Sequence, residues 1–276
     1  MEEKTLKTWS KEEVEMVINH KKNGITLLEL SEKLIRSYSS VESKSTRLNK
    51  NIKIEKAKDK TILVIGDLHA PFIKTGYLEF CIEMYKKHNC THVVFTGDIL
   101  DNHVASYHES DPDGMGGKDE LELAKKQILG FYEAFPFAKV CIGNHDALPN
   151  RKAYSNGISA SWIRTIDEVL SVPNWSFNEE WIIDRVKYIH GIGMKVRPRV
   201  LSEMCSIVQG HLHSETEYVT FVNEKELMFG LQIGCGIERR SYAMAYGRHF
   251  KKPQINVGIV TDNGRQAIVE HMKMGD

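Results

Sequence analysis

The stretch Thr61-Ile62-Leu63-Val64-Ile65-Gly66-Asp67-Leu68-His69 joins a run of mostly β-branched residues to two side chains that commonly bind metals. Apolar runs of this length without polar alternation are typical of strands buried on both faces of a sheet. In an extended segment, residues two apart project to the same side, so Asp67 and His69 would present their side chains together. The stretch therefore predicts a buried strand that ends in a pair of ligands.

Residues 92–95 and 139–142 form two further apolar runs, and each is followed by a Gly-Asp or Gly-Asn pair. Between the runs lie two stretches with helical periodicity, 76–87 and 118–135. Strands that alternate with helices predict stacked β-α units. Ligands in such sheets gather beyond the carboxyl ends of the strands, which is where the polar pairs lie.

Later in the chain the predicted strands follow one another more closely, as in an antiparallel or mixed second sheet. They span residues 186–189, 206–208, 218–222, 227–233, 256–260 and 266–269. We expect this second sheet to stack face to face on the first one.

Five short polar clusters contain the nitrogen and oxygen ligands that borderline divalent metals accept, and four of the five directly follow apolar runs. The clusters are Gly66-Asp67-Leu68-His69, Gly97-Asp98-Ile99-Leu100-Asp101, Gly143-Asn144-His145-Asp146, His190-Gly191 and Gly210-His211-Leu212-His213. We predict that they converge on one metal centre.

The chemistry of these ligands suits two metal ions. Asp98 can bridge two ions because a carboxylate has two oxygens, while Asn144 supplies a neutral oxygen and His190 a neutral nitrogen. A two-metal site with only two carboxylates keeps a residual positive charge. Such a site suits an anionic phosphoryl substrate.

The ordered series Asp-x-His, Gly-Asp-x-x-Asp, Gly-Asn-His-Asp, His and Gly-His-x-His resembles the calcineurin-like metallophosphoesterase superfamily over residues 61–276. The resemblance implies an α/β fold, a four-layer α/β/β/α sandwich of two mixed sheets, here preceded by a small three-helix domain. It also implies two divalent ions, with manganese favoured and iron, zinc or nickel as alternatives. One ion would be held by Asp67, His69, Asp98 and His213, and the other by Asp98, Asn144, His190 and His211.

The same resemblance implies a catalytic role for two further residues. A metal-bridging hydroxide would attack phosphorus in line with the leaving oxygen, and His145 would donate a proton or hydrogen bond to the leaving side. Asp101 would orient His145, as a carboxylate commonly fixes an imidazole tautomer. Protein Ser/Thr phosphatases have Gly after the first motif, whereas this chain has Ala70, so that subgroup is disfavoured.

Several residues outside the motifs are candidates for substrate contact. Arg151 could clamp a phosphate oxygen, although a surface Arg-Lys pair is the default explanation. His103 could line the site, and a solvated loop histidine explains it equally well. The turn-rich segment 111–117 is a candidate flap or a plain surface loop, and Arg239-Arg240 is a second candidate phosphate-facing loop.

The first 57 residues predict three helices. Ser10 with Glu13, Thr26 with Glu29 and Ser39 with Glu42 each have the spacing of a capping box. The segment resembles helix-turn-helix modules of the Myb/SANT-like type, with residues 39–48 as the recognition helix. That resemblance implies DNA binding through Lys44 and Arg47, while a solvated helical appendage for protein contacts or dimerisation is the alternative.

A polar, lysine-rich linker is expected over residues 49–60, so we place the domains at 1–57 and 58–276. The whole chain has zero net charge, but residues 1–60 hold 14 Lys and Arg against 10 Asp and Glu. No apolar run approaches the ~18 residues that a membrane helix needs, and we expect a cytoplasmic protein without membrane contact. The five cysteines lack CxxC spacing, so neither a disulfide framework nor a thiolate zinc site is indicated.

The sequence thus predicts a metal-dependent phosphoric ester hydrolase, with DNA or a nucleotide as the expected substrate and DNA as a partner of the N-terminal domain. The first alternative is a phosphomonoesterase or cyclic-nucleotide phosphodiesterase with a small substrate. The second alternative is a DNA-binding regulator with a structural metal site. The sequence does not determine the oligomeric state, the native metal, or whether cleavage is endonucleolytic or exonucleolytic.

Overall fold

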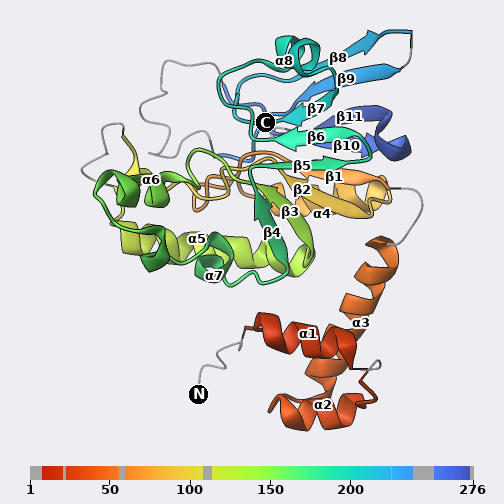
Figure 1. Ribbon diagram of the computed structural model, residues 1–276, viewed down its shortest axis with the longest axis vertical. Helices are drawn as coiled ribbons and strands as arrows, with labels where there is room; N and C mark the ends of the chain where they lie inside the picture. The colour runs from red at the N-terminus through yellow and green to blue at the C-terminus, as the bar shows by residue number, and fades with distance from the viewer. Residues whose placement is uncertain are drawn as a thin grey trace.

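The computed structural model describes residues 8–20, 23–55, 60–107, 114–224, 226–238 and 252–273. Two mixed sheets with helices on their outer faces make up the larger part, and three helices precede them (Figure 1). The predicted α/β class and the N-terminal group of helices are therefore confirmed.

The first sheet has six strands in the order β11-β10-β1-β2-β3-β4. They are β1 (Ile62–Ile65), β2 (His92–Phe95), β3 (Ala138–Cys141), β4 (Trp175–Asn178), β10 (Asn256–Thr261) and β11 (Gln266–His271). Strands β1 to β4 run parallel, whereas β10 is antiparallel to β1 and β11 is antiparallel to β10. The carboxyl ends of the four parallel strands therefore lie at one edge of the sheet.

The second sheet has five strands in the order β5-β6-β7-β9-β8. They are β5 (Glu180–Ile183), β6 (Val186–Ile189), β7 (Ser206–Gln209), β8 (Glu217–Val222) and β9 (Leu227–Gln232). Strands β6, β7 and β9 run parallel, and the two edge strands run antiparallel to their neighbours. This sheet is mixed, which is one of the two arrangements expected from the sequence.

Two of the predicted strands belong to the other sheet. We expected 256–260 and 266–269 to continue the second sheet, but β10 and β11 extend the first one beyond β1. The physical reason is that β10 is buried along its first five residues, which suits an interior strand paired on both sides. Strands β4 and β5 were not predicted.

Apolar residues of β1 alternate between two cores. Leu63 and Ile65 pack with the helices α4 (Tyr77–Lys87) and α5 (Gly117–Ala134), while Ile62 and Val64 face the second sheet. On the far side of the second sheet, α8 (Val196–Glu203) packs on a third apolar cluster. The order of layers is thus helix, sheet, sheet, helix, as the four-layer prediction required.

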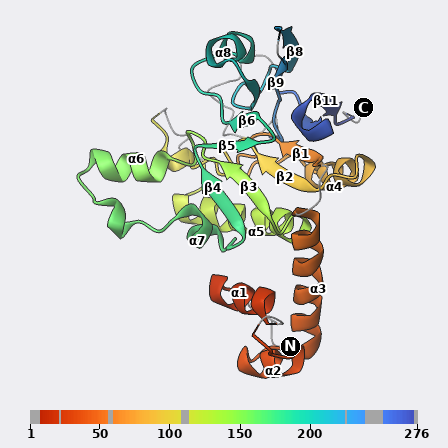
Figure 2. The same cartoon turned by 45° about the vertical axis from the view of Figure 1, so that its right-hand side comes forward.

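Short elements connect the strands of the first sheet. They are η1 (His103–Ala105), α6 (Leu148–Ser155), η2 (Ala160–Trp162) and α7 (Ile166–Leu170), and η4 (Asp262–Gly264) joins β10 to β11. Figures 1 and 2 both show α6 projecting from the layers at one end of the molecule.

The N-terminal helices are α1 (Lys11–Asn19), α2 (Leu27–Lys33) and α3 (Tyr38–Glu55). The capping boxes of Ser10 and Thr26 are confirmed at the starts of α1 and α2. The third predicted box is wrong, because α3 begins at Tyr38. The hydroxyl of Ser37, directly before it, accepts a hydrogen bond from the Ser40 N–H at 3.3 Å.

Helix α3 also changes the expected linker. Residues 49–55 continue the helix and are not an irregular connection, so the linker prediction is wrong over that range. The proposed domain boundary at residue 57 lies outside the described residues. Below α5 and α7 in Figure 1, the three helices form their own apolar core around Val14, Leu30 and Val41.

This N-terminal core touches the larger part of the chain. Phe137, which directly precedes β3, packs against it, and Lys11 forms an ion pair with Asp167 of α7. No helix in the described part of the chain is both long and apolar enough to span a bilayer.

Candidate metal centre

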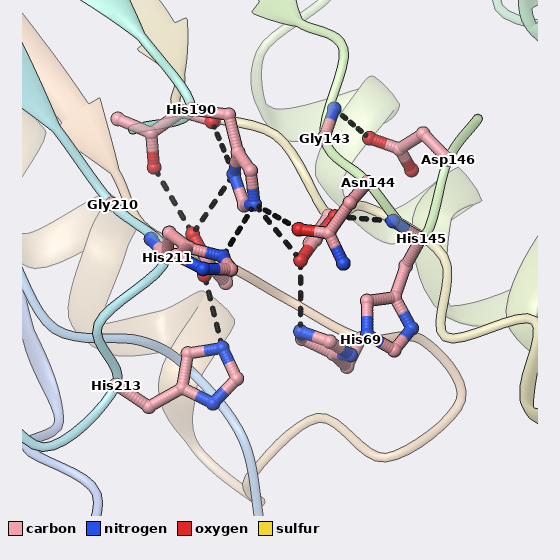
Figure 3. Close-up of polar contacts among 12 residues, drawn as sticks. His69, Gly143, Asn144, His145, Asp146, His190, Gly210, His211 and His213 are labelled. Carbon is pink, nitrogen blue, oxygen red and sulfur yellow. Dashed lines mark hydrogen bonds and ion pairs between the residues drawn. The ribbon is translucent and has the colours of Figure 1, made fainter. Parts of the chain in front are cut away.

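The predicted ligands lie on the loops that follow five parallel strands. Asp67 and His69 follow β1, Asp98 follows β2, and Asn144 follows β3. From the second sheet, His190 follows β6, and His211 and His213 follow β7. Because both sheets present the carboxyl ends of these strands to one region, side chains distant in sequence meet there (Figure 3).

One cluster contains Asp67, His69, Asp98 and His213, whose ligand atoms all lie within 4.8 Å of one another. His213 Nε2 lies 3.0 Å from Asp67 Oδ2, and His69 Nε2 lies 3.5 Å from Asp98 Oδ2. These four residues are the set predicted for one metal ion.

A second cluster contains Asp98, His190 and His211, also within 4.8 Å. His190 Nε2 lies 3.1 Å from Asp98 Oδ2 and 3.1 Å from His211 Nδ1. The Asn144 side-chain oxygen, at 2.9 Å from the same nitrogen, completes the set predicted for the other ion.

The hydrogen bonds of the imidazoles test whether a cation fits here. His69 donates from Nδ1 to Asp101 Oδ1 at 2.6 Å, and His190 donates from Nδ1 to the Thr96 carbonyl at 3.0 Å. When the ring is neutral, each bond leaves Nε2 as the atom with a lone pair directed into the cluster. His69 Nε2 is buried and has no hydrogen-bond partner. The donor set therefore fits divalent cations.

The charges of the clusters lead to the same conclusion. Burial alone would raise the pKa of Asp98, but the charge and hydrogen bond of His190 hold it well below its usual range. Burial alone would lower the pKa of His190, but the carboxylates of Asp98 and Asp67 raise it to about 9. A proton on His190 thus occupies the place of positive charge that a metal ion would take, and metal binding would release it.

Three of the predicted ligands have left-handed backbone conformations. The φ angles are 46° at His69, 47° at Asp98 and 70° at His211. Residues other than glycine rarely adopt such angles, and they are often held in place at functional sites. Here the His211 N–H donates to Asp67 Oδ2 at 2.9 Å, and the His69 N–H donates to the Asp98 carbonyl at 2.9 Å.

Asp101 acts on a different histidine from the one expected. Its carboxylate accepts the hydrogen bond of His69, whereas His145 Nδ1 lies 3.8 Å from that carboxylate. His145 Nδ1 instead donates to the backbone carbonyl of Asp101 at 2.6 Å. The prediction that the Asp101 carboxylate orients His145 is therefore corrected, because the main chain of Asp101 has that place and its side chain supports a candidate metal ligand.

Asp146 was quoted within a motif but received no role from the sequence. It is buried, and its carboxylate accepts hydrogen bonds from the N–H groups of Gly143 at 2.9 Å and Leu100 at 3.1 Å. It thereby ties the loop after β3 to the loop after β2. An Asp three residues after a loop glycine is a recognisable signal for such a bond to the main chain.

The other candidate residues are placed as follows. His103 is buried, its N–H donates to Glu120 Oε1 at 2.8 Å, and its ring nitrogen Nδ1 lies 3.8 Å from Asp101 Oδ2. Arg151 is exposed on α6, with its guanidinium carbon 5.4 Å from the ring centre of Tyr107. Arg239, Arg240 and residues 111–113 lie outside the described residues.

The two residues expected to face DNA differ in exposure. Arg47 is exposed on α3, but Lys44 is only 8% exposed. The Lys44 ammonium lies 5.4 Å from the ring centre of Trp9 and 5.9 Å from that of Tyr132 in α5. Lys44 therefore faces α5, and its expected position on a phosphate-facing surface is wrong.

Residues 60–227, which include every candidate ligand, match the model of the family described as calcineurin-like phosphoesterase. The chain belongs to the calcineurin-like phosphoesterase family. With its cluster of Asp and His side chains, this calcineurin-like phosphoesterase is a metal-dependent phosphoester hydrolase. A search of the curated proteins found no match.

Several solved structures are similar to this calcineurin-like phosphoesterase. Vacuolar protein sorting 29 from Cryptosporidium parvum has 14% identity, covering 78% of this chain and 99% of that one, with a TM-score of 0.40. The phosphoesterase Yfce from E. coli has 11% identity, covering 77% and 100%, with a TM-score of 0.36. The nuclease MPE from Pseudomonas putida has 15% identity, covering 65% and 76%, with a TM-score of 0.32.

Proposed function

We propose that this phosphoesterase hydrolyses phosphodiester bonds of DNA or nucleotides at a centre of two divalent cations. The position of Asp98 is the observation that supports two cations best. Its Oδ2 lies 3.5 Å from His69 Nε2 in one cluster and 3.1 Å from His190 Nε2 in the other. A carboxylate that faces two sets of ligands is suited to bridging two ions.

The proposed ligands of one cation are Asp67, His69, Asp98 and His213, and those of the other are Asp98, Asn144, His190 and His211. When bound, such cations stabilise the charge of a transferring phosphoryl group and lower the pKa of water for the attack. Their mixed nitrogen and oxygen donors suit manganese, with iron, zinc and nickel as alternatives.

His145 is the proposed donor to the leaving oxygen. Its Nδ1 donates to the Asp101 carbonyl, which leaves Nε2 as the ring atom that can hold a proton toward the substrate. Burial and then the charge of His69 lower the pKa of His145. A bound phosphoester would act in the opposite direction, because its negative charge favours the protonated ring.

The test compares substrates with manganese present: a chromogenic phosphodiester, single-stranded and double-stranded DNA, a cyclic nucleotide and a chromogenic phosphomonoester. We expect hydrolysis of the diesters, and His145→Ala should lower kcat by about 10²–10⁴-fold. Metal content of this variant should stay at the wild-type level. His271→Ala, an exposed histidine on β11, is the matched control and should retain activity.

Two results would contradict the proposal. Wild type that hydrolyses the monoester but none of the diesters would be a phosphomonoesterase with a small substrate. Wild type that binds manganese without hydrolysing any of these substrates would have a structural metal site.

The N-terminal unit, residues 1–57, is the proposed second contact with DNA. Arg47 supports this role because it is exposed on α3, the helix that would serve as the recognition helix under the resemblance to helix-turn-helix modules. In the full-length chain, Arg47→Glu should weaken DNA binding. The slope of the logarithm of the binding constant against the logarithm of the salt concentration should become shallower by about one unit. Arg265→Glu, exposed beside β11, is the control. If Arg47→Glu and wild type had equal slopes, Arg47 would not contact DNA and the proposed role of the N-terminal unit would be wrong.

A further inference from the structure

The segment after His145 and the segment after Asp101 are fastened to each other next to the candidate metal centre. The Asn102 side-chain amide donates to the His145 carbonyl at 2.9 Å, and the Leu148 N–H donates to the same carbonyl at 3.2 Å. Helix α6 begins at Leu148 and contacts both η1 and η2. The loop that carries the proposed leaving-group donor is therefore joined to the first turn of α6 and to the segment that leads into η1.

These elements expose three large aromatic side chains. Tyr107, two residues after η1, is 56% exposed, and Tyr154 of α6 and Trp162 of η2 are each 85% exposed. Among the described residues, the other strongly exposed aromatic side chains, Tyr38 and Tyr218, reach 44%. Single exposed aromatics are ordinary, but three around one short helix leave much apolar ring surface in water.

The charge of the same region has one sign. Residues 147–165 contain Arg151, Lys152 and Arg164 and no Asp or Glu. The Lys152 ammonium lies 4.0 Å from the ring centre of Tyr107, and the Arg151 guanidinium carbon lies 5.4 Å from it. Cations placed directly at an aromatic face form a surface that is complementary to a ligand with both flat rings and negative charge.

Unpaired nucleic acid combines these two properties. Every nucleobase has a flat face that can stack on Tyr or Trp, and every linkage has a phosphate that Arg or Lys can bind. A duplex keeps its base faces stacked inside the helix, so it cannot use exposed rings in this way.

We propose that Tyr107, Arg151, Lys152, Tyr154 and Trp162 form a stacking ledge that holds a single-stranded polynucleotide across the candidate metal centre. The ledge rests on the proposed function and narrows its substrate from DNA or nucleotides to unpaired strands. Tyr154 and Trp162 stack on bases, while Arg151 and Lys152 contact the phosphates between them.

Binding is measured with the full-length chain in the His145→Ala background, which prevents cleavage during the titration. The probe is a fluorescent single-stranded oligodeoxynucleotide of about 16 nucleotides. Adding Tyr154→Ala and Trp162→Ala together should weaken binding by about 30-fold or more, because two stacking contacts are lost. A variant that carries Trp162→Phe and keeps Tyr154 should bind nearly as tightly as its parent, because phenylalanine keeps a stacking face. Tyr218→Ala, on the edge strand β8, is the matched control and should bind as its parent does.

A second measurement reports stacking directly. The oligonucleotide should quench tryptophan fluorescence of the parent protein, and Trp162→Phe should remove most of that quenching. The ledge is overturned if the double variant binds the strand as tightly as its parent, or if the same variant loses duplex binding to the same extent.

The chromogenic phosphodiester separates failure of the ledge from failure of the proposed function. If wild type hydrolyses this diester but its binding of the strand does not depend on the ledge, the proposed function stands and the ledge is wrong. If wild type hydrolyses no diester in the presence of manganese, the proposed function itself is wrong.

Discussion

The Asp101 carboxylate accepts a hydrogen bond from His69 Nδ1 at 2.6 Å, and His69 in turn points Nε2 at Asp98 Oδ2. Both partners are almost completely buried. A carboxylate in this position fixes the ring orientation of the histidine and makes its other nitrogen a stronger donor to a metal ion. We therefore propose that Asp101 positions His69 in the candidate metal centre.

Graded substitutions of Asp101 should reveal this role. Asp101→Asn keeps an acceptor for His69 but removes the charge, and we expect metal affinity to fall by about 10-fold. Asp101→Ala removes both, and the expected loss is about 100-fold. Calorimetric titration with manganese measures each value, and Asp262→Asn on the exposed η4 turn is the control. An Asp101→Ala protein with wild-type affinity would show that the hydrogen bond does not support the metal.

Bound metal should stabilise the fold, because its ligands come from both sheets. Manganese at about 100 times its dissociation constant should raise the free energy of unfolding by about 2.7 kcal/mol. Asp98→Asn should abolish this gain, since Asp98 belongs to both clusters. Thermal unfolding with manganese or with a chelator gives the comparison. A gain that persists in Asp98→Asn would place the stabilising ion elsewhere.

Gly143 leaves the space that Asp98 occupies. A Cβ atom at Gly143 would overlap the Asp98 main-chain nitrogen and Asp98 Oδ1, which is held in place by the His145 N–H that donates to it at 2.8 Å. Gly143→Ala should therefore displace the Asp98 carboxylate, the proposed bridge, and this change should remove metal binding and lower the melting temperature. Gly116→Ala is the matched control, because a Cβ there meets nothing within 4 Å. Metal content and melting temperature are the two measurements, and a Gly143→Ala protein with full metal content would contradict the expectation.

Lys44 should make the stability of the N-terminal unit depend on pH. Burial, followed by the charges of Arg47 and Arg36, lowers its pKa from 10.5 to about 8. The unfolded chain then binds this proton more tightly than the folded one, so the free energy of unfolding rises with pH between about 8 and 10.5. Below that window the full penalty of the buried charge applies.

Replacing Lys44 by Met should remove the penalty. At pH 7 we expect the free energy of unfolding to rise by about 1–2 kcal/mol, a value reduced for partial hydration of the ammonium group. The gain should shrink as the pH approaches 10. Urea unfolding followed by fluorescence measures it, with the exposed Lys33→Met as control. A gain that is equal at both pH values would exclude the charge of Lys44 as its cause.

The candidate metal centre was predictable from the sequence because its candidate ligands lie in the loops that directly follow strands. Asp67, Asp98 and Asn144 come at the carboxyl ends of adjacent parallel strands, and that local pattern is enough to bring them together. The strands β6 and β7 place His190 and His211 by the same rule in the second sheet. Their convergence therefore needed no knowledge of side-chain packing.

Other features depend on contacts between distant parts of the chain. Lys44 lies in a helix with a polar sequence, so the sequence suggests an exposed side chain. Its burial depends on packing near Tyr132 of α5, which is distant in sequence. The role of Asp101 depends on whether its main chain or its side chain reaches a histidine, which sequence spacing cannot specify. The place of β10 in the first sheet likewise depends on its pairing with β1.

That pairing has a consequence for synthesis of the protein on the ribosome. Strand β1 lies between β2 and β10, and β10 follows it by about 190 residues along the chain. At roughly 5–20 residues per second, translation takes about 10–40 s to cover this interval. Throughout that time the nascent chain presents Ile62 to Ile65 with one hydrogen-bonding edge unpaired, and such an edge invites aggregation. The edge of β1 that pairs with β10 therefore stays open until almost the whole chain has been synthesised.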